Sequence, residues 1–469
     1  MIAFSKFNFF IPTKGGIIIF NPLYSTLVFI DKNSFTKIEK VIKEKRPIYD
    51  ENIRQDIDKL KKLNLIVDES FDELIFFNYL HNKAKFRNDV LQVTILPTYD
   101  CNMSCIYCVQ RDTHSPIYMT NEIAQQIVKW IKSRMSRNLY RQVALSFYGG
   151  EPLLNFKVID LICGEIKDFC EDMGVSFRTS IITNGTLLTE EVIMKLSEYN
   201  IAYSQITIDG VKEVHDKRRP FRNGKGTFDI ILENTEKFIE LSASSNVLIR
   251  INIDKSNAER VPEFLDFLEE EGLKYKVGID FARVIPPLGC ATCPLDIFTE
   301  EEFAKIYIWL IDECIKRNFP FTWRIVSYYL ACGANADWSI IIDPLGNFYK
   351  CLDMMGDEKY CVGNLKDGFN HKYYDWITRN PLEFDECRNC KILPICCGGC
   401  LRQAYSTKGT IHANYCSRLK YYAEDFIMRY TEQKYRRQIE KALKLSKEMV
   451  RRESQDTIHP SSIRMEESR

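Results

Sequence analysis

Three cysteines stand close together in the stretch YDCNMSCIYCVQ, which spans residues 99–110. Cys101, Cys105 and Cys108 are separated by three residues and then by two. A cubane iron–sulfur cluster has four irons, and each normally takes one cysteine thiolate, so three thiolates leave one iron open. An open position is also what separates a catalytic from a structural zinc site. A zinc knuckle or a set of unpaired thiols is the alternative for this spacing.

A second group of cysteines lies near the C-terminus. Its members are Cys332, Cys351, Cys387, Cys390, Cys396, Cys400 and Cys416. The chain has 17 cysteines, which is many for a reducing compartment where disulfides rarely persist, so metal binding explains their clustering better. Seven ligands in this order suit two clusters better than one four-ligand zinc site, although a zinc ribbon is the alternative.

The trio and three other unusual stretches each follow a predicted strand. The three are YGGEP at residues 148–152, TNGT at 183–186 and IDG at 208–210. In barrels built from strand–helix units the chemistry lies where the strands end, so we expect all four to meet on one face.

Together with the aromatic Tyr107 before Cys108, these features resemble the radical S-adenosylmethionine (radical SAM) superfamily. Its signature of Cys, three residues, Cys, any residue, aromatic, Cys is matched in full. The resemblance implies that the open iron binds the amino and carboxylate groups of S-adenosylmethionine (SAM). An electron from the reduced cluster then cleaves the sulfonium bond, and the 5′-deoxyadenosyl radical abstracts hydrogen from an unreactive carbon in a water-excluded site. An electron donor such as flavodoxin or ferredoxin is the implied partner.

The same resemblance implies contacts to SAM. The predicted set is Tyr107, Gly149, Gly150, Glu151, Asn184, Thr207, Asp209 and Arg219. The two glycines would let the backbone approach the methionine moiety, and Glu151 would accept from its ammonium group. An ordinary strand-to-helix turn is the alternative for this stretch.

The other predicted SAM contacts carry alternatives too. An Asn-Gly turn explains Thr183 and Asn184 nearly as well. Arg219 is expected to clamp the cofactor carboxylate, as a guanidinium fork suits, whereas Lys217 and Arg218 also fit a solvated charge run.

The second cysteine group resembles the SPASM extension, found on radical SAM enzymes that mostly modify peptides and proteins. The resemblance implies three 4Fe-4S clusters in all. One auxiliary cluster would take Cys387, Cys390, Cys396 and Cys416 as ligands, and the other Cys332, Cys351 and Cys400. A fourth ligand of the latter is missing. An iron open to a substrate thiolate is our first expectation, and the alternatives are Cys361, Cys397, Cys290 and Cys293.

Length and composition are consistent with an enzyme of several domains. The 469 residues are 45% hydrophobic, and 64 basic side chains balance 64 acidic ones. The balance gives no indication of nucleic acid or membrane partners. Lys6, Pro12 and Lys14 interrupt the apolar N-terminus, so we expect a cytoplasmic protein without export signal.

Six β-rich stretches alternate with helical ones from Leu91 onward, namely LQVTILPT, QVALSFYG, FRTSIIT, YSQITIDG, VLIRINI and KVGIDFARV. This predicts an α/β fold with parallel βαβ units in a partial (β/α)6 barrel. A capping box is expected at residues 299–302, and a hairpin turn at DPLGN, residues 343–347, should present Cys351. Cys163, Cys170 and Cys314 lie on helical patterns and are expected to fill core.

The predicted organisation has four parts: a small winged-helix-like peptide-recognition domain at 1–85, the radical SAM barrel at 86–320, the cysteine-rich SPASM domain at 321–430, and a charged helix with a disordered tail at 431–469. The first part combines a hairpin-like pair, two helices and a final apolar strand, with a linker at residues 81–89. It resembles the domains of peptide maturases that bind a leader peptide by strand addition.

The function implied is therefore maturation of a ribosomally made precursor peptide, with a thioether or other crosslink as the expected product. An anaerobic sulfatase-maturating enzyme is the alternative, but such enzymes usually carry an aspartate directly after the cysteine at the Cys351 position. Here Leu352 stands there and Asp353 follows as a weak candidate base. Peptide epimerisation, and a non-catalytic metal-stabilised peptide-binding protein, are further alternatives.

Overall fold

The computed structural model describes residues 1–45, 47, 49–110, 115–137, 139–242, 246–288, 295–321 and 326–434. Spatial contacts divide the chain into a unit of residues 1–422 and a second unit that begins at Ala423. The predicted tail beyond residue 434, and both Cys290 and Cys293, lie outside the described residues.

A ten-stranded sheet forms the centre of the larger unit. Six strands are parallel neighbours in the order β11 (Val277–Arg283), β10 (Asn246–Ile253), β9 (Ile201–Thr207), β8 (Ser176–Thr183), β7 (Gln142–Phe147) and β6 (Val90–Ile95). All six predicted strands are thus confirmed, and the fold is α/β with a parallel sheet.

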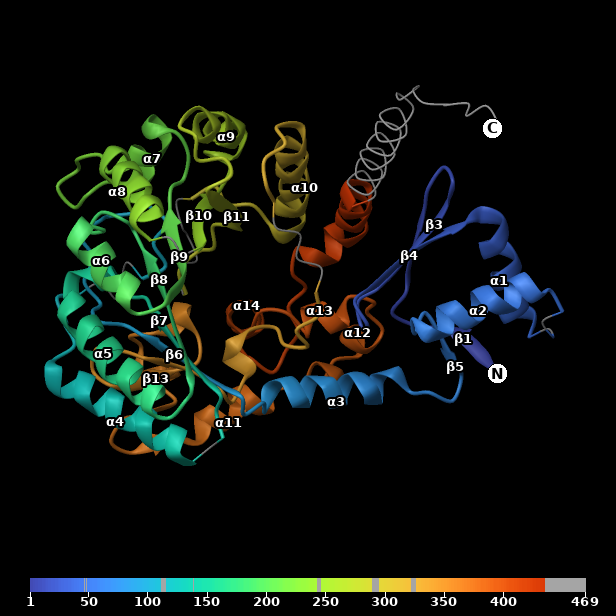
Figure 1. Ribbon diagram of the computed structural model, residues 1–469, viewed down its shortest axis with the longest axis horizontal. Coiled ribbons are helices and arrows are strands. Elements are labelled where there is room, and N and C mark those ends of the chain that lie inside the picture. The colour runs from blue at the N-terminus through green and yellow to red at the C-terminus, as the bar shows by residue number, and fades with distance from the viewer. Residues whose placement is uncertain are drawn as a thin grey trace, which may run out of the picture. The chain divides into compact units, whose positions relative to one another are not determined.

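Helices between these strands lie around one face of the sheet (Figure 1). They are α4 (Asn121–Arg137), α5 (Phe156–Asp172), α6 (Glu190–Glu198), α7 (Lys212–Arg218), α8 (Phe228–Leu241) and α9 (Val261–Glu270). In α4 the buried residues Ala124, Ile127, Val128 and Ile131 recur at helical spacing, which gives the helix one apolar stripe. The predicted capping box opens α10 (Glu300–Lys316), where Thr299 and Glu302 bond reciprocally.

The cysteine-rich region continues the same sheet. β12 (Ser339–Ile342) pairs in parallel with β6 and antiparallel with β13 (Asn347–Tyr349), followed by β14 (Gly363–Asn364) and β15 (Gly368–Phe369). The predicted hairpin is confirmed, and Gly346 adopts φ of 84° in its turn. The pairing with β6 is a finding that local turn chemistry does not predict.

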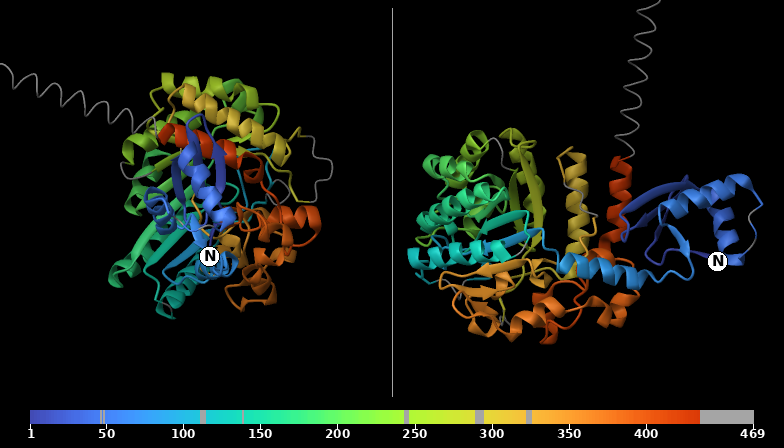
Figure 2. Two further views of the ribbon diagram at one scale, coloured as in Figure 1. Left: turned by 90° about the vertical axis from the view of Figure 1, so that its right-hand side faces the viewer. Right: turned by 60° about the horizontal axis from the view of Figure 1, so that its bottom comes forward.

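Short helices complete this region, shown in orange below the sheet in the right-hand view of Figure 2. They are α11 (His371–Thr378), α12 (Asp385–Arg388), α13 (Leu393–Cys396) and α14 (Leu401–Lys408).

The N-terminal elements form two small sheets and two helices. β2 (Phe9–Pro12), β3 (Gly16–Asn21) and β4 (Thr26–Asp31) make an antiparallel sheet with β3 in the middle, and β1 (Ile2–Phe4) pairs with β5 (Ile66–Asp68). Helices α1 (Lys32–Glu44) and α2 (Glu51–Lys62) bury Ile38, Ile42, Ile53, Ile57 and Leu60 in a small core of their own. The predicted hairpin is therefore a three-stranded sheet.

The predicted linker at residues 81–89 is wrong in its first half, because α3 (Glu73–Lys85) runs through it. His81 and Lys85 are buried, and Trp338 Nε1 donates to Ala84 O at 2.8 Å. Polar residue types indicated a loop, but here they pack against the cysteine-rich region. Among the helices in the described part of the chain, none has the length and apolar character of a membrane span.

Candidate active site

A cavity of about 340 Å³ lies at the carboxyl ends of the parallel strands. Its walls include Cys101, Cys105 and Cys108 and residues that follow or end the other strands, among them Gly150, Asn184, Thr207, Asn252 and Arg283. The structure thus brings the cysteine trio and the distant strand ends together on one face.

The trio lines this cavity without converging on a point. Within the described ranges, no group of three or more His, Cys, Asp or Glu side chains is placed to hold a single metal ion. In a cubane cluster each thiolate binds a different iron, so three thiols that line one cavity can hold such a cluster and leave one iron open. Burial raises the pKa of Cys101 to about 12, and metal binding is what would deprotonate such a thiol.

The loop that carries Cys101 is tied to the C-terminal region. Tyr99 Oη donates to Asp343 Oδ2 at 2.8 Å, and both residues are buried. Asp343 also caps the turn between β12 and β13, where its side chain accepts from Leu345 N and Asn347 N. The turn that presents Cys351 and the loop that presents Cys101 therefore share one hydrogen-bonded support.

Gly149 and Gly150 line the cavity, and their lack of a side chain has a clear physical reason. A Cβ on Gly150 would lie 2.1 Å from Asp100 O, and one on Gly149 would lie 2.6 Å from Thr98 O. Gly149 also has φ of 148°. The two glycines let the turn after β7 pack directly on the backbone of the cysteine loop. Their predicted contact with a bound cofactor stays a prediction.

Glu151 is completely buried and joins two strand ends. Its carboxylate accepts from Thr183 Oγ1 (2.7 Å), Asn184 N (2.7 Å) and Leu153 N (3.1 Å). Burial raises its pKa, whereas these hydrogen bonds favour the charged form. The observed role is to fix the end of β7 to the end of β8. Its predicted acceptance from an ammonium group stays a prediction.

Asn184 links the β8 end to the cysteine loop. Its Nδ2 donates to Asn102 Oδ1 at 2.8 Å and lies 3.9 Å from Cys101 Sγ. Its Oδ1 accepts from Thr186 N, which is the local turn that the Asn-Gly sequence predicts. The predicted turn is therefore confirmed, and the predicted contact of Asn184 with a bound cofactor stays a prediction.

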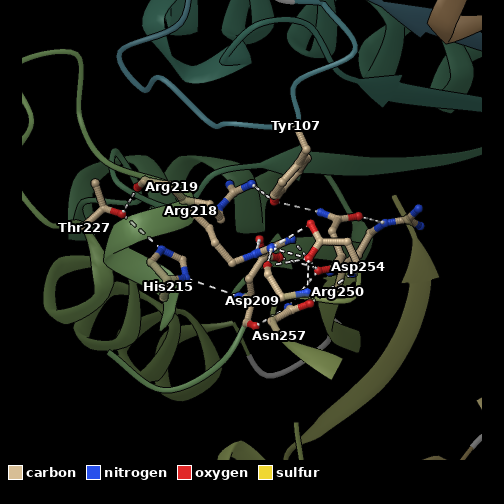
Figure 3. A network of polar contacts seen from close by, with 11 residues as sticks. Tyr107, Asp209, His215, Arg218, Arg219, Thr227, Arg250, Asp254 and Asn257 are labelled. Atoms are coloured by element: carbon tan, nitrogen blue, oxygen red, sulfur yellow. Dashed lines mark hydrogen bonds and ion pairs between the residues drawn. The ribbon is translucent and has the colours of Figure 1, made fainter. Parts of the chain in front are cut away.

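Tyr107 and Arg219 meet at the cavity wall (Figure 3). Arg219 Nη1 and Asn252 Nδ2 both donate to Tyr107 Oη, at 2.8 and 3.0 Å. Arg219 is 6% exposed, and among the described residues its buried Nε has no hydrogen-bond partner. A buried N–H without a partner is costly, so an acceptor such as a carboxylate fits here.

His215 is linked to the backbone of Arg219 through Thr227 (Figure 3). Asp209 N donates to His215 Nδ1 at 3.2 Å, so the proton is on Nε2 and faces Thr227 Oγ1 at 3.0 Å. Thr227 Oγ1 in turn donates to Arg219 O at 2.6 Å. Burial, with the charges of Arg219 and Arg218, lowers the pKa of His215 well below its usual value. The ring is neutral and holds the backbone of Arg219 in place.

Arg218 is not part of a solvated charge run, which corrects one alternative for this stretch. It is 3% exposed, and its guanidinium binds Asp254 at 2.8 Å and Asp209 at 3.2 Å. Asp209 also accepts from Asn252 N at 3.0 Å. The predicted cofactor contact Asp209 is thus engaged in joining β9 to β10. Lys217 is exposed, as the alternative expected.

Several cavity residues were not found from the sequence. They include Arg250, Asn252 and Arg283, whereas Tyr148 belongs to the predicted YGGEP stretch. Asn252 and Arg283 lie at the ends of β10 and β11, so the strand-end rule applied to the last two strands would have found them. Asp353 also lines the cavity, close to Arg402, whose Nε is 3.9 Å from Asp353 Oδ2. Burial raises the pKa of Asp353.

The C-terminal cysteines fall into two sets. Cys387, Cys390, Cys396 and Cys416 line one small pocket. Burial raises the pKa of Cys351. The electrostatic influence of Asp353, Cys332 and Cys400 raises it further, so Cys332 and Cys400 are neighbours of Cys351. None of the cysteines in the described ranges forms a disulfide.

Two further cysteines are in contact with backbone carbonyls. Cys361 lines a separate groove and its Sγ lies 3.1 Å from Gly363 O, whereas the Sγ of the buried Cys397 lies 3.7 Å from Pro394 O. Cys163, Cys170 and Cys314 are buried in helices, as expected.

Residues 95–268 match the model of the radical SAM superfamily. This span contains the cysteine trio and the stretches at the ends of β7, β8 and β9. The protein is a radical SAM enzyme. The family implies a 4Fe-4S cluster and SAM, and the residues that line the cavity fit both. They include three thiols and Arg219, whose buried Nε has no partner among the described residues.

This radical SAM enzyme is similar to several maturation enzymes. It is 24% identical to a cysteine-type anaerobic sulfatase-maturating enzyme of Clostridium novyi, over 71% of this chain and 94% of that protein. It is 26% identical to the mycofactocin maturase MftC of Mycolicibacterium smegmatis, over 66% and 78%.

Solved structures show the same fold. Native anSMEcpe with bound AdoMet and Cp18Cys peptide has a TM-score of 0.58 at 22% identity, covering 73% of this chain and 99% of that one. Streptococcus suis SuiB bound to its precursor peptide SuiA has a TM-score of 0.53 at 16% identity, covering 89% and 99%.

Proposed function

We propose that this enzyme is a radical SAM/SPASM maturase of a ribosomally made precursor peptide, and that its most favoured product is a thioether or other crosslink. The observation that carries the radical chemistry is the shared cavity of the cysteine trio and Arg219. Relatives that act on proteins or peptides support the substrate class.

The residues of the cavity have separate tasks. Cys101, Cys105 and Cys108 would hold the SAM-binding cluster, and Arg219 would bind the carboxylate of SAM through its unpartnered Nε. When bound, the cluster and SAM supply a 5′-deoxyadenosyl radical that abstracts hydrogen from the substrate. Tyr107 orients Arg219, and Glu151 fixes the two strand ends that form the adjoining wall.

The N-terminal region is the candidate binding site for a leader peptide. The likeness to SuiB, whose structure includes a bound precursor peptide, spans more of this chain than the likeness to anSMEcpe. Among the described residues β4 pairs only with β3, and all six of its residues are at least partly exposed. Its outer edge could therefore accept an added strand, with affinity supplied by backbone hydrogen bonds.

The C-terminal cysteines would hold two auxiliary 4Fe-4S clusters. Cys387, Cys390, Cys396 and Cys416 supply four thiolates, whereas Cys332, Cys351 and Cys400 supply three. The Sγ atoms of Cys361 and Cys397 contact the backbone carbonyls of Gly363 and Pro394. A cysteine of the substrate is therefore our first candidate for the remaining position, and Cys290 and Cys293, which lie outside the described residues, are the alternatives. This favours a crosslink that uses a cysteine sulfur.

Sulfatase-type maturation is the second candidate function. Asp353 supports it, because this carboxyl lines the same cavity as the cysteine trio although it stands one residue later than the family pattern. A peptide epimerase would instead require a hydrogen donor opposite the radical.

Co-expression with a candidate precursor tests these alternatives. The precursor would be a short cysteine-containing peptide encoded beside the gene, followed by mass spectrometry of the product. A crosslink predicts the loss of two hydrogens. Formylglycine formation from a cysteine predicts the loss of sulfur and two hydrogens and the gain of one oxygen, and an epimer has unchanged mass. If the anaerobically reduced enzyme forms no 5′-deoxyadenosine from SAM, the proposed chemistry is wrong.

A further inference from the structure

One buried arginine in the cysteine-rich region forms no ion pair with any carboxylate that the structure describes. Arg379, which follows α11, is completely buried. Its guanidinium donates to four backbone carbonyls: Nε to Ile411 O (2.8 Å), Nη1 to Cys397 O (3.2 Å), and Nη2 to Gly398 O and Ala413 O (both 2.8 Å). An arginine stays protonated in proteins, so a full positive charge is buried here.

Arg379 lies beside both cysteine sets. Its guanidinium donates to the carbonyls of Cys397 and Gly398, directly after Cys396. Arg379 O accepts from Asn335 Nδ2 at 3.3 Å, three residues after Cys332. In order of influence, burial lowers the pKa of Arg379, whereas the charges of Cys387, Cys332, Cys396 and Cys397 oppose that effect. Cys387 and Cys396 belong to one proposed cluster site and Cys332 belongs to the other. Arg379 is therefore a neighbour of both sets.

The chain is built closely around the guanidinium. A Cβ on Gly398 would lie 3.0 Å from Nη2 of Arg379, and Gly398 has φ of 82°. A second buried cation adds to the positive charge, because Lys85 Nζ donates to Arg379 O at 3.0 Å. Among the described residues neither cation forms an ion pair with a carboxylate.

A buried charge without a counter-charge is strongly unfavourable, so this interior needs a negative charge that its carboxylates do not supply. We propose that Arg379 is the shared counter-charge of the two auxiliary iron–sulfur clusters and raises their reduction potentials. It does so because the reduced cluster carries one more negative charge than the oxidised one. The inference rests on the proposed function in one respect, namely that both cysteine sets hold clusters.

The competing explanation is that Arg379 only ties loops together through their carbonyls. Two substitutions separate the effect of the positive charge of Arg379 from the effect of its hydrogen bonds to the loops. Arg379→Lys keeps the charge and loses part of the hydrogen bonding, whereas Arg379→Gln loses the charge and keeps some hydrogen bonding. The matched control is Lys274→Gln. Lys274 follows α9 and is also largely buried, but its positive charge is paired with the carboxylate of Glu269.

The experiment is a redox titration of the full-length, reconstituted enzyme, followed by electron paramagnetic resonance, with iron and sulfide content measured for each protein. We expect Arg379→Gln to lower the ratio of reduced to oxidised auxiliary cluster at least tenfold at a fixed potential, which is about 59 mV for a one-electron couple. Arg379→Lys and Lys274→Gln should titrate close to the wild type.

The outcomes separate this inference from the proposed function. If the wild type holds no auxiliary cluster, the proposed function fails. If it holds them and the Lys and Gln variants titrate alike, only the role of Arg379 fails. Should the Gln variant lose its iron, retention by the Lys variant supports the charge role, whereas equal loss in both variants shows scaffolding and overturns it.

Discussion

Arg219 Nη1 donates to the phenolic oxygen of Tyr107 at 2.8 Å, across 112 positions of sequence. This bond joins the loop of the cysteine trio to the end of α7. Both residues line the cavity, and within the described part of the chain the buried Nε of Arg219 has no hydrogen-bond partner. Tyr107, a residue of the cysteine motif, thus holds the guanidinium of Arg219, the candidate for binding the cofactor carboxylate.

Replacing Tyr107 by Phe should weaken SAM binding while leaving the cluster in place. The change removes the acceptor of Arg219 and of Asn252, and a hydrogen bond of this kind contributes about 1 kcal/mol, or roughly fivefold in Kd. Equilibrium dialysis of SAM against the reconstituted enzyme measures this. The control is Tyr374→Phe, at an exposed tyrosine. An unchanged Kd would show that the bond does not position Arg219.

Cys105→Ala should abolish formation of 5′-deoxyadenosine and lower iron by about four atoms per chain, the content of one 4Fe-4S cluster. Iron and sulfide assays on the anaerobically purified protein provide the test. Cys170→Ala, in the buried face of α5, should leave iron unchanged because that cysteine only fills core. Loss of zinc in place of iron would favour the metal-stabilised binding protein.

Gly150→Ala should disrupt the SAM-binding cluster site, because the new Cβ would lie 2.1 Å from Asp100 O and the backbone must move. Gly164→Ala is the matched control, since a Cβ there meets nothing within 4 Å and the residue lies inside α5. Alanine in a helix is favoured by roughly 0.5–1 kcal/mol over glycine, so the control should be as stable as the wild type or more so. Equal iron content in both variants would contradict the close packing described here.

His81→Asn should reduce the loss of stability at low pH. Burial lowers the pKa of His81 to about 4, from about 6.5 in the unfolded chain. The unfolded state therefore binds a proton first, and stability falls as the pH drops below about 6.5 towards about 4. His81 Nδ1 bonds Tyr329 O at 2.6 Å, and an asparagine amide offers the same donor without titrating.

Urea unfolding at about pH 7 and about pH 5.5 measures this effect. Between the two, the wild type should lose about 1 kcal/mol more than the variant. The same loss in both proteins would mean that His81 is protonated or exposed in the folded state.

Much of the central sheet could be predicted, since alternating β and helical patterns determine where βαβ units begin and end. The capping box at Thr299 and the turn around Gly346 are also local chemistry, and both are present. Polar residue types misled the prediction where tertiary packing decides, as at His81 and Lys85 in α3 and at Arg218. The pattern of charges alone does not show which of them are buried.

The site was predictable only in part, for a related reason. The cysteine spacing and the strand ends identified a face of the fold. They did not predict the hydrogen bonds from Thr183 and Asn184 to Glu151, which lies more than 30 residues earlier in the sequence. Nor could the four backbone carbonyls that accept from Arg379 be predicted, because every residue type has a backbone carbonyl.

The pairing of β12 with β6 means that the cysteine-rich region is no detachable module. Cutting the chain ahead of Ser339 would strip hydrogen-bond partners from Gln92 to Ile95, the strand that leads directly into the first cysteine loop. Grafting this region onto another scaffold, or deleting it to obtain a minimal catalyst, would therefore damage the very segment meant to be preserved.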